Sequence, residues 1–266
     1  MADPNDLNNV KTQPGGLGEQ RSVGADAGVA VTTTVFVQPL PKGTAAVELI
    51  PRNSGSSALL VKYAVNPQLY VFKTTDDGVT FTDYSDNAQD DSVSTDVTLS
   101  SLGTLAQGDY LYVGAPIPFR GVRIDVDAAN ANASVLTVKY LNTAGAWVNI
   151  TATDGTDSGG ASMAVDGNVT WTVPTAWALN TLSNTNIGKK LYWTRWEVSA
   201  ALDSTTTLNS LLPLNRSTAY RQLLINSLPT IFSIIPGLDR SLEFLTETGT
   251  ANLIVNVFSG DGKKFR

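Results

Sequence analysis

The chain has 266 residues and carries little charge: 42% of its residues are hydrophobic, 16% are charged, and its formal net charge at pH 7 is −6. This length suffices for one large or two small domains, and the acidic balance argues against nucleic acid as a partner, because phosphate binding needs clustered Lys and Arg. The sequence contains neither Cys nor His, which excludes disulfides, thiol nucleophiles and every mechanism that needs a histidine base.

Residues 1–28 are polar and rich in Gly, Pro and Asn, and they show no hydrophobic periodicity. We expect an extended N-terminal arm here, which either lies across a neighbouring subunit or folds onto its own domain. The segment lacks the apolar core of a signal peptide, and no stretch of the sequence approaches the ~20 apolar residues of a membrane span. We therefore expect neither a secretory leader nor a membrane partner.

Residues 29–109 predict a β-rich domain, because short segments rich in β-branched and aromatic residues follow one another. These segments are 29–37, 45–50, 58–65, 70–74, 79–84 and 110–113, the last of which begins the next domain. Asp76, Asp77 and Gly78 form a strong hairpin signal between two of them. An acidic polar loop is expected at 86–96.

Residues 110–215 predict a β-sandwich. Further strands are expected at 121–126, 135–141, 147–151, 162–165, 169–173 and 191–200. Apolar and polar residues alternate in 135–141, and the turn around Gly145 leads into the next strand. Turn signals about every 8–12 residues are typical of an all-β sandwich or barrel.

Residues 216–266 form an apolar C-terminal extension, in which we expect a β-hairpin around the turn Thr248–Thr250. The two strands of this hairpin are predicted at 241–245 and 253–259. The segment 219–226 fits either a short helix or a strand. The extension either packs on the first domain and completes it, or covers a subunit interface.

All five tryptophans lie between Trp147 and Trp196, in strands separated by Asp-Gly turns. Large aromatic residues in this arrangement are typical of the core and rim of a β-sandwich. Trp177 follows Pro174 closely and is expected on a loop. Trp193 and Trp196 are three residues apart and cannot face the same way on an ideal strand, so we expect one of them to point outward or to a sheet edge.

Two interpretations of these aromatic residues remain open: they fill a core, or they contact a glycan or a protein partner. The candidate residues for such a contact are Trp177, Trp193, Trp196 and Arg195. Sugar C–H faces stack on exposed aromatic rings, which favours a glycan for any tryptophan at the surface. Arg195 either stacks on a ring or pairs with Asp125 or Asp127 of the opposing sheet.

The carboxylate side chains suggest two further kinds of site, a catalytic one and a calcium-binding one. A pair of them could act as acid and base in glycoside hydrolysis, and the candidates are Asp125, Asp127, Asp154, Asp157 and Glu197. Alternatively, loop residues could bind calcium through their oxygen atoms. The candidate groups are Asp154, Thr156 and Asp157, or Asp86, Asp90 and Asp91. Most of these aspartates fall in turns, where a carboxylate accepts hydrogen bonds from its own backbone. We therefore expect no enzyme, no cofactor and no metal site.

A pattern of aromatic strands and Asp-Gly turns runs through several segments of the second half. The segments are Pro118–Val122, Leu136–Tyr140, Ala146–Asn149, Asp154–Thr156, Gly167–Trp177 and Leu191–Trp196. With them, the stretch from about Tyr110 to Asp203 resembles a discoidin-like jelly-roll module that recurs in structural proteins of tailed bacteriophages. The resemblance implies a virion-associated protein without naming its place in the virion, and it does not extend to the remaining residues.

Composition and resemblance together predict an all-β, non-enzymatic phage virion protein with β-sandwich or jelly-roll domains, an extended N-terminal arm and a C-terminal β-hairpin extension. We expect a capsid decoration, or cement, protein that braces neighbouring capsid subunits and forms a homo-oligomer, with a trimer favoured. Its expected partners are the major capsid protein or other virion proteins. The alternative is a tail, baseplate or fibre component that binds a host surface glycan through the Trp-rich module.

Overall fold

The computed structural model describes residues 17–23, 29–40, 43–52, 60–89, 94–100, 102–103, 108–183, 185, 188–214, 220–224, 229–234 and 239–260. These residues form β-strands, turns and a short 3₁₀ helix η1 at Asn87–Gln89, and none of them lies in an α-helix. The all-β fold class is therefore confirmed. A helix long and apolar enough to cross a membrane is not found in this part of the chain.

The chain divides into two compact units, one built from Met1–Asn66 and Thr218–Arg266 and the other from Pro67–Ser217. The boundary thus follows Asn66, whereas we expected it between residues 109 and 110. The reason is that Tyr70–Thr74 pairs with Tyr110–Ala115, which places both strands in the second unit. The C-terminal extension returns to the first unit, where its strands complete both sheets.

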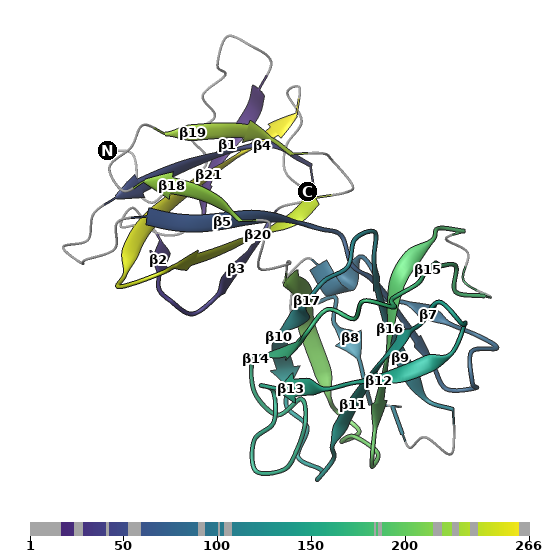
Figure 1. Ribbon diagram of the computed structural model, residues 1–266. Coiled ribbons are helices and arrows are strands. Elements are labelled where there is room, and N and C mark those ends of the chain that lie inside the picture. The colour runs from purple at the N-terminus through teal and green to yellow at the C-terminus, as the bar shows by residue number, and fades with distance from the viewer. Residues whose placement is uncertain are drawn as a thin grey trace. The chain divides into compact units, whose positions relative to one another are not determined.

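The strands of the first unit form two antiparallel sheets (Figure 1). One has the order β1-β21-β4-β19, with β2 also on β21, and the other the order β18-β5-β20-β3. The bounds are β1 Leu17–Val23, β2 Val29–Val31, β3 Phe36–Pro39, β4 Thr44–Arg52, β5 Leu60–Pro67, β18 Arg221–Leu224, β19 Thr230–Ser233, β20 Asp239–Thr246 and β21 Ala251–Gly260. Apolar residues of both sheets, such as Leu49, Val61, Phe244 and Val255, are fully buried in one cluster.

Part of the expected N-terminal arm folds onto its own unit. Strand β1 pairs antiparallel with β21 of the same chain, and Gln20 lies opposite Phe258 and Val23 opposite Val255. This arrangement corresponds to the second of the two expectations for the arm. Residues 1–16 and 24–28 lie outside the described residues.

The two C-terminal strands lie where the sequence predicts them, but they do not form the expected hairpin. In the described residues β20 belongs to the sheet with β5 and β3, whereas β21 belongs to the sheet with β1, β2 and β4. Gly249, which has a φ of +65°, lies in the turn that carries the chain from one sheet to the other. The turn signal was correct, and the pairing inferred from it was wrong.

The second unit also contains two antiparallel sheets (Figure 1). The larger sheet has the order β12-β11-β16-β9-β6-β7, with β15 also on β16, and the smaller one the order β13-β14-β10-β17-β8. The bounds are β6 Tyr70–Thr74, β7 Thr82–Asp83, β8 Val97–Thr98, β9 Tyr110–Ala115, β10 Gly121–Ala128, β11 Leu136–Leu141, β12 Trp147–Ile150, β13 Ala152–Asp154, β14 Gly167–Trp171, β15 Leu179–Asn180, β16 Leu191–Val198 and β17 Thr207–Leu214.

The main core of this unit is formed by residues from both sheets. Val113 and Trp196 of the larger sheet and Ile124 and Val169 of the smaller one belong to the same buried cluster. Because side chains alternate between the two faces of a strand, each of these strands keeps a second set of residues for its other face. The outer face of the larger sheet has its own aromatic cluster, which is described below as the outer-face cluster.

Candidate functional site

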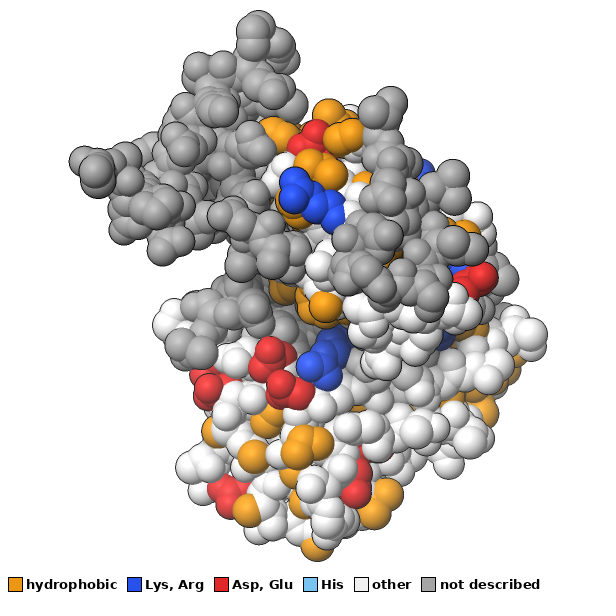
Figure 2. All heavy atoms as spheres, turned by 90° about the vertical axis from the view of Figure 1, so that its left-hand side faces the viewer, with side chains coloured by type: hydrophobic (Ala, Val, Ile, Leu, Met, Phe, Trp, Pro, Cys, Tyr) orange, Lys and Arg blue, Asp and Glu red, His pale blue; other side chains and the backbone are white. Residues whose placement is uncertain are grey.

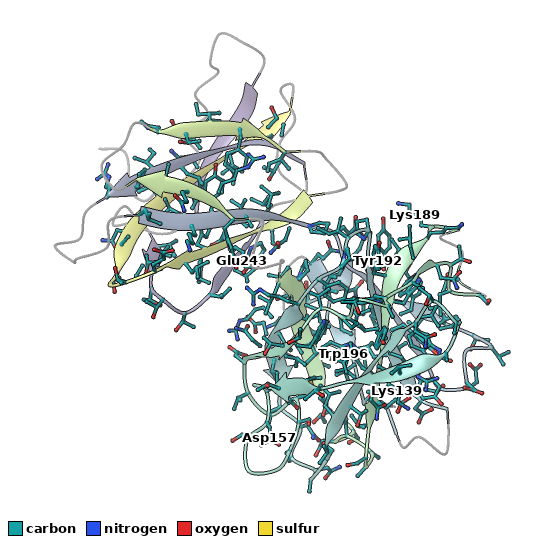
Figure 3. The ribbon with its side chains drawn as sticks, viewed as in Figure 1. Lys139, Asp157, Lys189, Tyr192, Trp196 and Glu243 are labelled. Atoms are coloured by element: carbon teal, nitrogen blue, oxygen red, sulfur yellow. The ribbon has the colours of Figure 1, made fainter. Side chains whose placement is uncertain are left out.

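The outer-face cluster consists of aromatic and leucine side chains on neighbouring strands. Its buried members are Tyr70, Phe72, Tyr110, Tyr112, Leu191 and Trp193, and Phe81, Trp147 and Leu182 pack against them. Trp196, by contrast, belongs to the core cluster that the two sheets share (Figure 3). Trp193 and Trp196 therefore do point to opposite faces of β16, as their spacing predicts. The outward-pointing one is nevertheless covered.

Trp177 lies outside the named strands, as expected, but it is buried. Trp177 is only 6% exposed, and Trp193 and Trp196 are 0% exposed. Trp177 does lie on a loop, but its ring packs against Phe119, with 5.1 Å between the ring centroids, and meets Tyr192 edge to face. These tryptophans provide no open ring face, which the glycan interpretation requires.

The buried indoles also have their polar atoms satisfied inside the fold. Trp177 Nε1 donates to the carbonyl oxygen of Trp193 (2.9 Å), and Trp193 Nε1 donates to that of Asn180 (3.0 Å). Trp171 Nε1 donates to the carbonyl oxygen of Phe119, and Trp196 Nε1 donates to Oγ1 of Thr194. A buried indole N–H is costly unless it is hydrogen-bonded, so this set of bonds marks the rings as parts of the structure.

Arg195 lies on the outer face and stacks between two rings. Its guanidinium carbon is 4.3 Å from the ring centroid of Tyr110 and 5.3 Å from that of Trp147. Its Nη2 lies 2.6 Å from Oε1 of Glu197, a side chain that is 1% exposed. The predicted ring stacking is therefore confirmed, whereas the carboxylate that Arg195 contacts is that of Glu197 on its own strand and not that of Asp125 or Asp127.

A second cation completes this charge cluster. Lys139 of the neighbouring strand β11 lies directly opposite Arg195, and its Nζ is 2.7 Å from Glu197 Oε2. The Lys139 and Arg195 side chains are 20% and 15% exposed. Burial raises the pKa of the nearby Tyr112 to about 12, although the positive charge of Arg195 acts in the opposite direction. The arrangement places the Arg195 guanidinium against the ring of Trp147 and beside the carboxylate of Glu197.

Sequence reasoning missed both charged neighbours of Arg195 on this face. Glu197 is two residues further along β16 and so shares its face, which the period of a strand could have shown. Lys139 comes from another strand, and its position depends on a register that no local pattern reveals.

The candidate catalytic aspartates of β10 have partners on the adjacent strand β17. Asp125 accepts a hydrogen bond from Asn209 Nδ2 (3.2 Å), and Asp127 accepts one from Thr207 Oγ1 (2.9 Å). These bonds connect neighbouring strands of the smaller sheet. Glu197, the remaining strand carboxylate, belongs to the charge cluster with Lys139 on the larger sheet.

In the first group of calcium candidates, Asp154 and Thr156 are bonded to each other in a turn. Asp154 Oδ1 accepts hydrogen bonds from the backbone N–H (2.8 Å) and the hydroxyl (2.6 Å) of Thr156, which is the turn geometry expected from sequence. Asp157 is exposed on the following loop. Asp90 and Asp91 lie outside the described residues, and within the described part no group of three or more acidic, His or Cys side chains could hold a metal ion.

No protein-family model matches this chain, and no curated protein matches it. The resemblance of the stretch from Tyr110 to Asp203 to a discoidin-like phage module therefore stays a prediction from the sequence pattern.

Proposed function

We propose that this protein is a non-enzymatic structural component of a tailed-phage virion, and that it serves there as a capsid decoration protein. The observation that carries the proposal is the burial of Trp177, Trp193 and Trp196, whose indole N–H groups are all bonded inside the second unit. The aromatic residues that the sequence offered for a ligand instead pack inside the β-sandwich. A sandwich with filled and hydrogen-bonded aromatic clusters suits a bracing role on a capsid.

The character of the surface supports the same proposal. Figure 2 shows one face of the molecule, on which the described residues present mostly uncharged polar side chains and backbone, with few charged groups. Charged residues make up only 16% of the chain. Such a surface binds its partners through apolar contacts and hydrogen bonds more than through ion pairs, so its attachment to a capsid should tolerate salt.

The proposed partners are the major capsid protein and further copies of this chain, with a trimer as the favoured oligomer. The alternative role, a tail or fibre protein that grips a host glycan through the Trp-rich module, loses its main argument because the tryptophans are covered. A bracing protein and a receptor-binding protein differ in what their removal does to the particle.

The test compares particles produced with and without this chain. We expect particles that lack it to release their genome at lower temperature or after milder osmotic shock, and purified protein added back to restore the resistance of the wild type. Unchanged particle resistance together with lost adsorption to the host would contradict the decoration role and favour the tail or fibre alternative.

A further inference from the structure

The first unit is built from two separate stretches of the chain, and the second unit is the continuous stretch between them. The chain leaves the first unit after Asn66, near the end of β5, and returns to it at Thr218, just before β18. Strand β18 pairs antiparallel with β5, and Arg221 lies opposite Tyr63. Both crossings therefore belong to neighbouring strands of one sheet, and the second unit stands where a hairpin would have its loop.

One buried carboxylate contacts both strands near these crossings. Glu243 (Figure 3) lies on β20, the other neighbour of β5 in the sheet, and is 0% exposed. Asn66 Nδ2 donates to its Oε2 (3.2 Å), and the Tyr220 hydroxyl donates to its Oε1. Asn66 is the last residue before the chain leaves the first unit, and Tyr220 follows its return closely. We call this arrangement the Glu243 contact.

The hydrophobic cores of the two units are separate. In the described residues, the cluster that contains Val61 and Phe244 draws on the first unit alone. The cluster around Leu111 and the outer-face cluster draw on the second unit alone. Because burial of apolar surface is the main favourable term in folding, each unit has its own source of stability.

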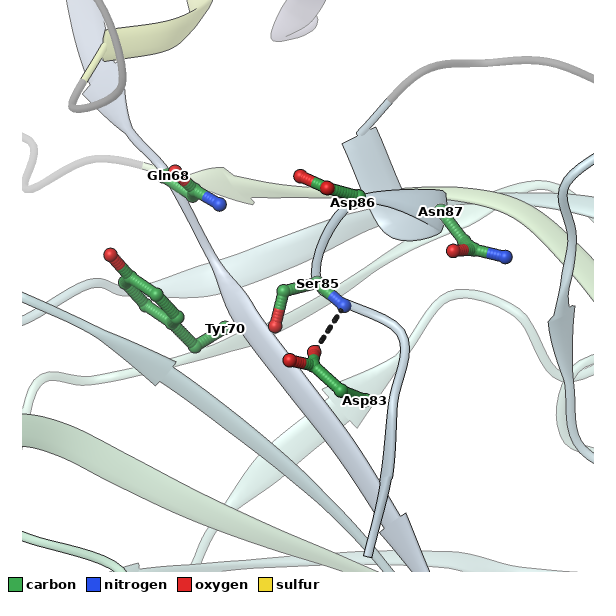
Figure 4. A pocket seen from close by; sticks show the side chains of 6 residues that line it. All are labelled: Gln68, Tyr70, Asp83, Ser85, Asp86 and Asn87. Atoms are coloured by element: carbon green, nitrogen blue, oxygen red, sulfur yellow. Dashed lines mark hydrogen bonds between the residues drawn. The ribbon is translucent and has the colours of Figure 1, made fainter. Parts of the chain in front are cut away.

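The two ends of the second unit are held by residues of that unit. At its start, the carbonyl oxygen of Leu69 accepts from Gln89 Nε2 (2.9 Å). The residues that line the polar pocket at this place, about 330 Å³ in volume, all fall between positions 68 and 87 (Figure 4). At its end, the carbonyl oxygen of Leu214 accepts from the backbone N–H of Arg120 (3.0 Å). These contacts need no residue of the first unit.

We infer that the second unit is an inserted module that folds on its own, and that the Glu243 contact closes the first unit at the insertion point. A hairpin normally keeps the ends of its two strands together by a short loop, and a long connection does so less well. The hydrogen bonds of Glu243 to Asn66 and Tyr220 take over that task. This inference is independent of the virion proposal, because it concerns how the chain folds and not what it binds.

The experiment follows the two units separately in the full-length chain. Tryptophan fluorescence reports on the second unit alone, because all five tryptophans lie within it. Hydrogen exchange with mass spectrometry reports on β5, β18 and β20 of the first unit. We expect Glu243→Gln to accelerate exchange in these three strands about tenfold or more, since hydrogen bonds to a buried charge are lost. The urea midpoint of the fluorescence should stay at the wild-type value.

Three further variants complete the test. Tyr220→Phe removes one hydroxyl, should accelerate exchange in the same strands to a smaller extent, and serves as the probe if Glu243→Gln does not fold. Gly114→Ala, which adds a Cβ against the Trp193 ring, should lower the fluorescence midpoint and leave exchange in the first unit unchanged. The matched control is Glu247→Gln, which is 58% exposed and pairs with Lys62 of β5, and it should accelerate exchange far less than Glu243→Gln.

Three results would overturn the inference. A fluorescence midpoint that falls in Glu243→Gln would show that the two units unfold together, and so would faster exchange of the first unit in Gly114→Ala. Unchanged exchange of β5, β18 and β20 in both Glu243→Gln and Tyr220→Phe would show that the Glu243 contact does not close the first unit.

Discussion

Gly114 leaves the space that the Trp193 ring occupies. The two residues lie directly opposite each other in the pairing of β9 with β16. A Cβ placed on Gly114 would lie 2.5 Å from Cε3 and 2.6 Å from Cζ3 of the Trp193 ring, closer than real Cβ atoms approach other atoms. The outer-face cluster therefore depends on a residue without a side chain under its largest ring.

Replacing this glycine should weaken the second unit. We expect Gly114→Ala to lower the free energy of unfolding by about 2 kcal/mol, because an added methyl group in a filled site displaces its neighbours. Urea denaturation followed by circular dichroism measures this change. In a Trp193→Ala background the same substitution should cost much less, and an equal cost in both backgrounds would mean that the ring is not the obstacle.

The carboxylate of Glu197 should be needed by the two cations beside it. In Glu197→Gln the charges of Lys139 and Arg195 stay on the outer face without their anion, and we expect a loss of about 3 kcal/mol, as for the removal of one partner of a buried ion pair. The matched control is Glu247→Gln, whose side chain is 58% exposed and pairs with Lys62 at the surface. We expect the control to lose less than about 1 kcal/mol, and equal losses would contradict a special role for Glu197.

Asp76 should titrate at unusually low pH. Hydrogen bonds from the side chain (2.6 Å) and backbone N–H (2.9 Å) of Thr80 and from the Thr74 hydroxyl (2.7 Å) lower its pKa from the ordinary 3.8 to about 2. Because these bonds favour the charged form in the folded state, they stabilise the hairpin at pH above 3.8, and this contribution is lost as the pH falls through about 2. A carboxyl ¹³C titration with a midpoint near 3.8 would show that the bonds do not form.

Fluorescence quenching should single out one tryptophan. Trp147 is half-buried, whereas the four other tryptophans, all in the described part of the chain, are 6% exposed or less. We expect acrylamide to quench a small fraction of the emission in the folded protein, and Trp147→Phe to remove most of that fraction. If Trp177→Phe removes it instead, Trp177 is exposed in solution and the glycan interpretation of the Trp-rich module regains its basis.

Local patterns predicted the strands that adjacent turns connect. The segments around Asp76–Gly78 and around Gly145 do form hairpins, β6 with β7 and β11 with β12. In both cases alternating residues flank a turn whose glycine has a positive φ, +82° at Gly78 and +79° at Gly145. Such information is contained within about a dozen residues, which is why it is readable from sequence.

Other strands were missed because their signal is not local. Strand β17 ends in the run Leu211–Leu214, which has no alternation and contains Pro213, yet it pairs with β10 along most of its length. The predicted strand at 162–165 is a turn region, in which Met163 adopts a φ of +60°. The unit boundary after Asn66 depends on the pairing of β6 with β9, whose partners are far apart in the chain.

In the candidate site too, local spacing was readable from the sequence and contacts between distant strands were not. The spacing of Trp193 and Trp196 correctly predicted opposite faces, but nothing in the sequence showed that the outer one would lie in a buried cluster against which Trp147 and Phe81 pack. The charge cluster of Arg195, Glu197 and Lys139 was missed because the register of β11 with β16 assembles it.

The central claim is a structural role in the virion, and the copy number of the chain tests it most directly. On the proposal that a tailed phage encodes this chain, quantitative mass spectrometry of its purified particles gives the abundance of the chain relative to the major capsid protein. A decoration protein should approach the abundance of the capsid protein or a fixed simple fraction of it. A handful of copies per particle, or none, would contradict the decoration role.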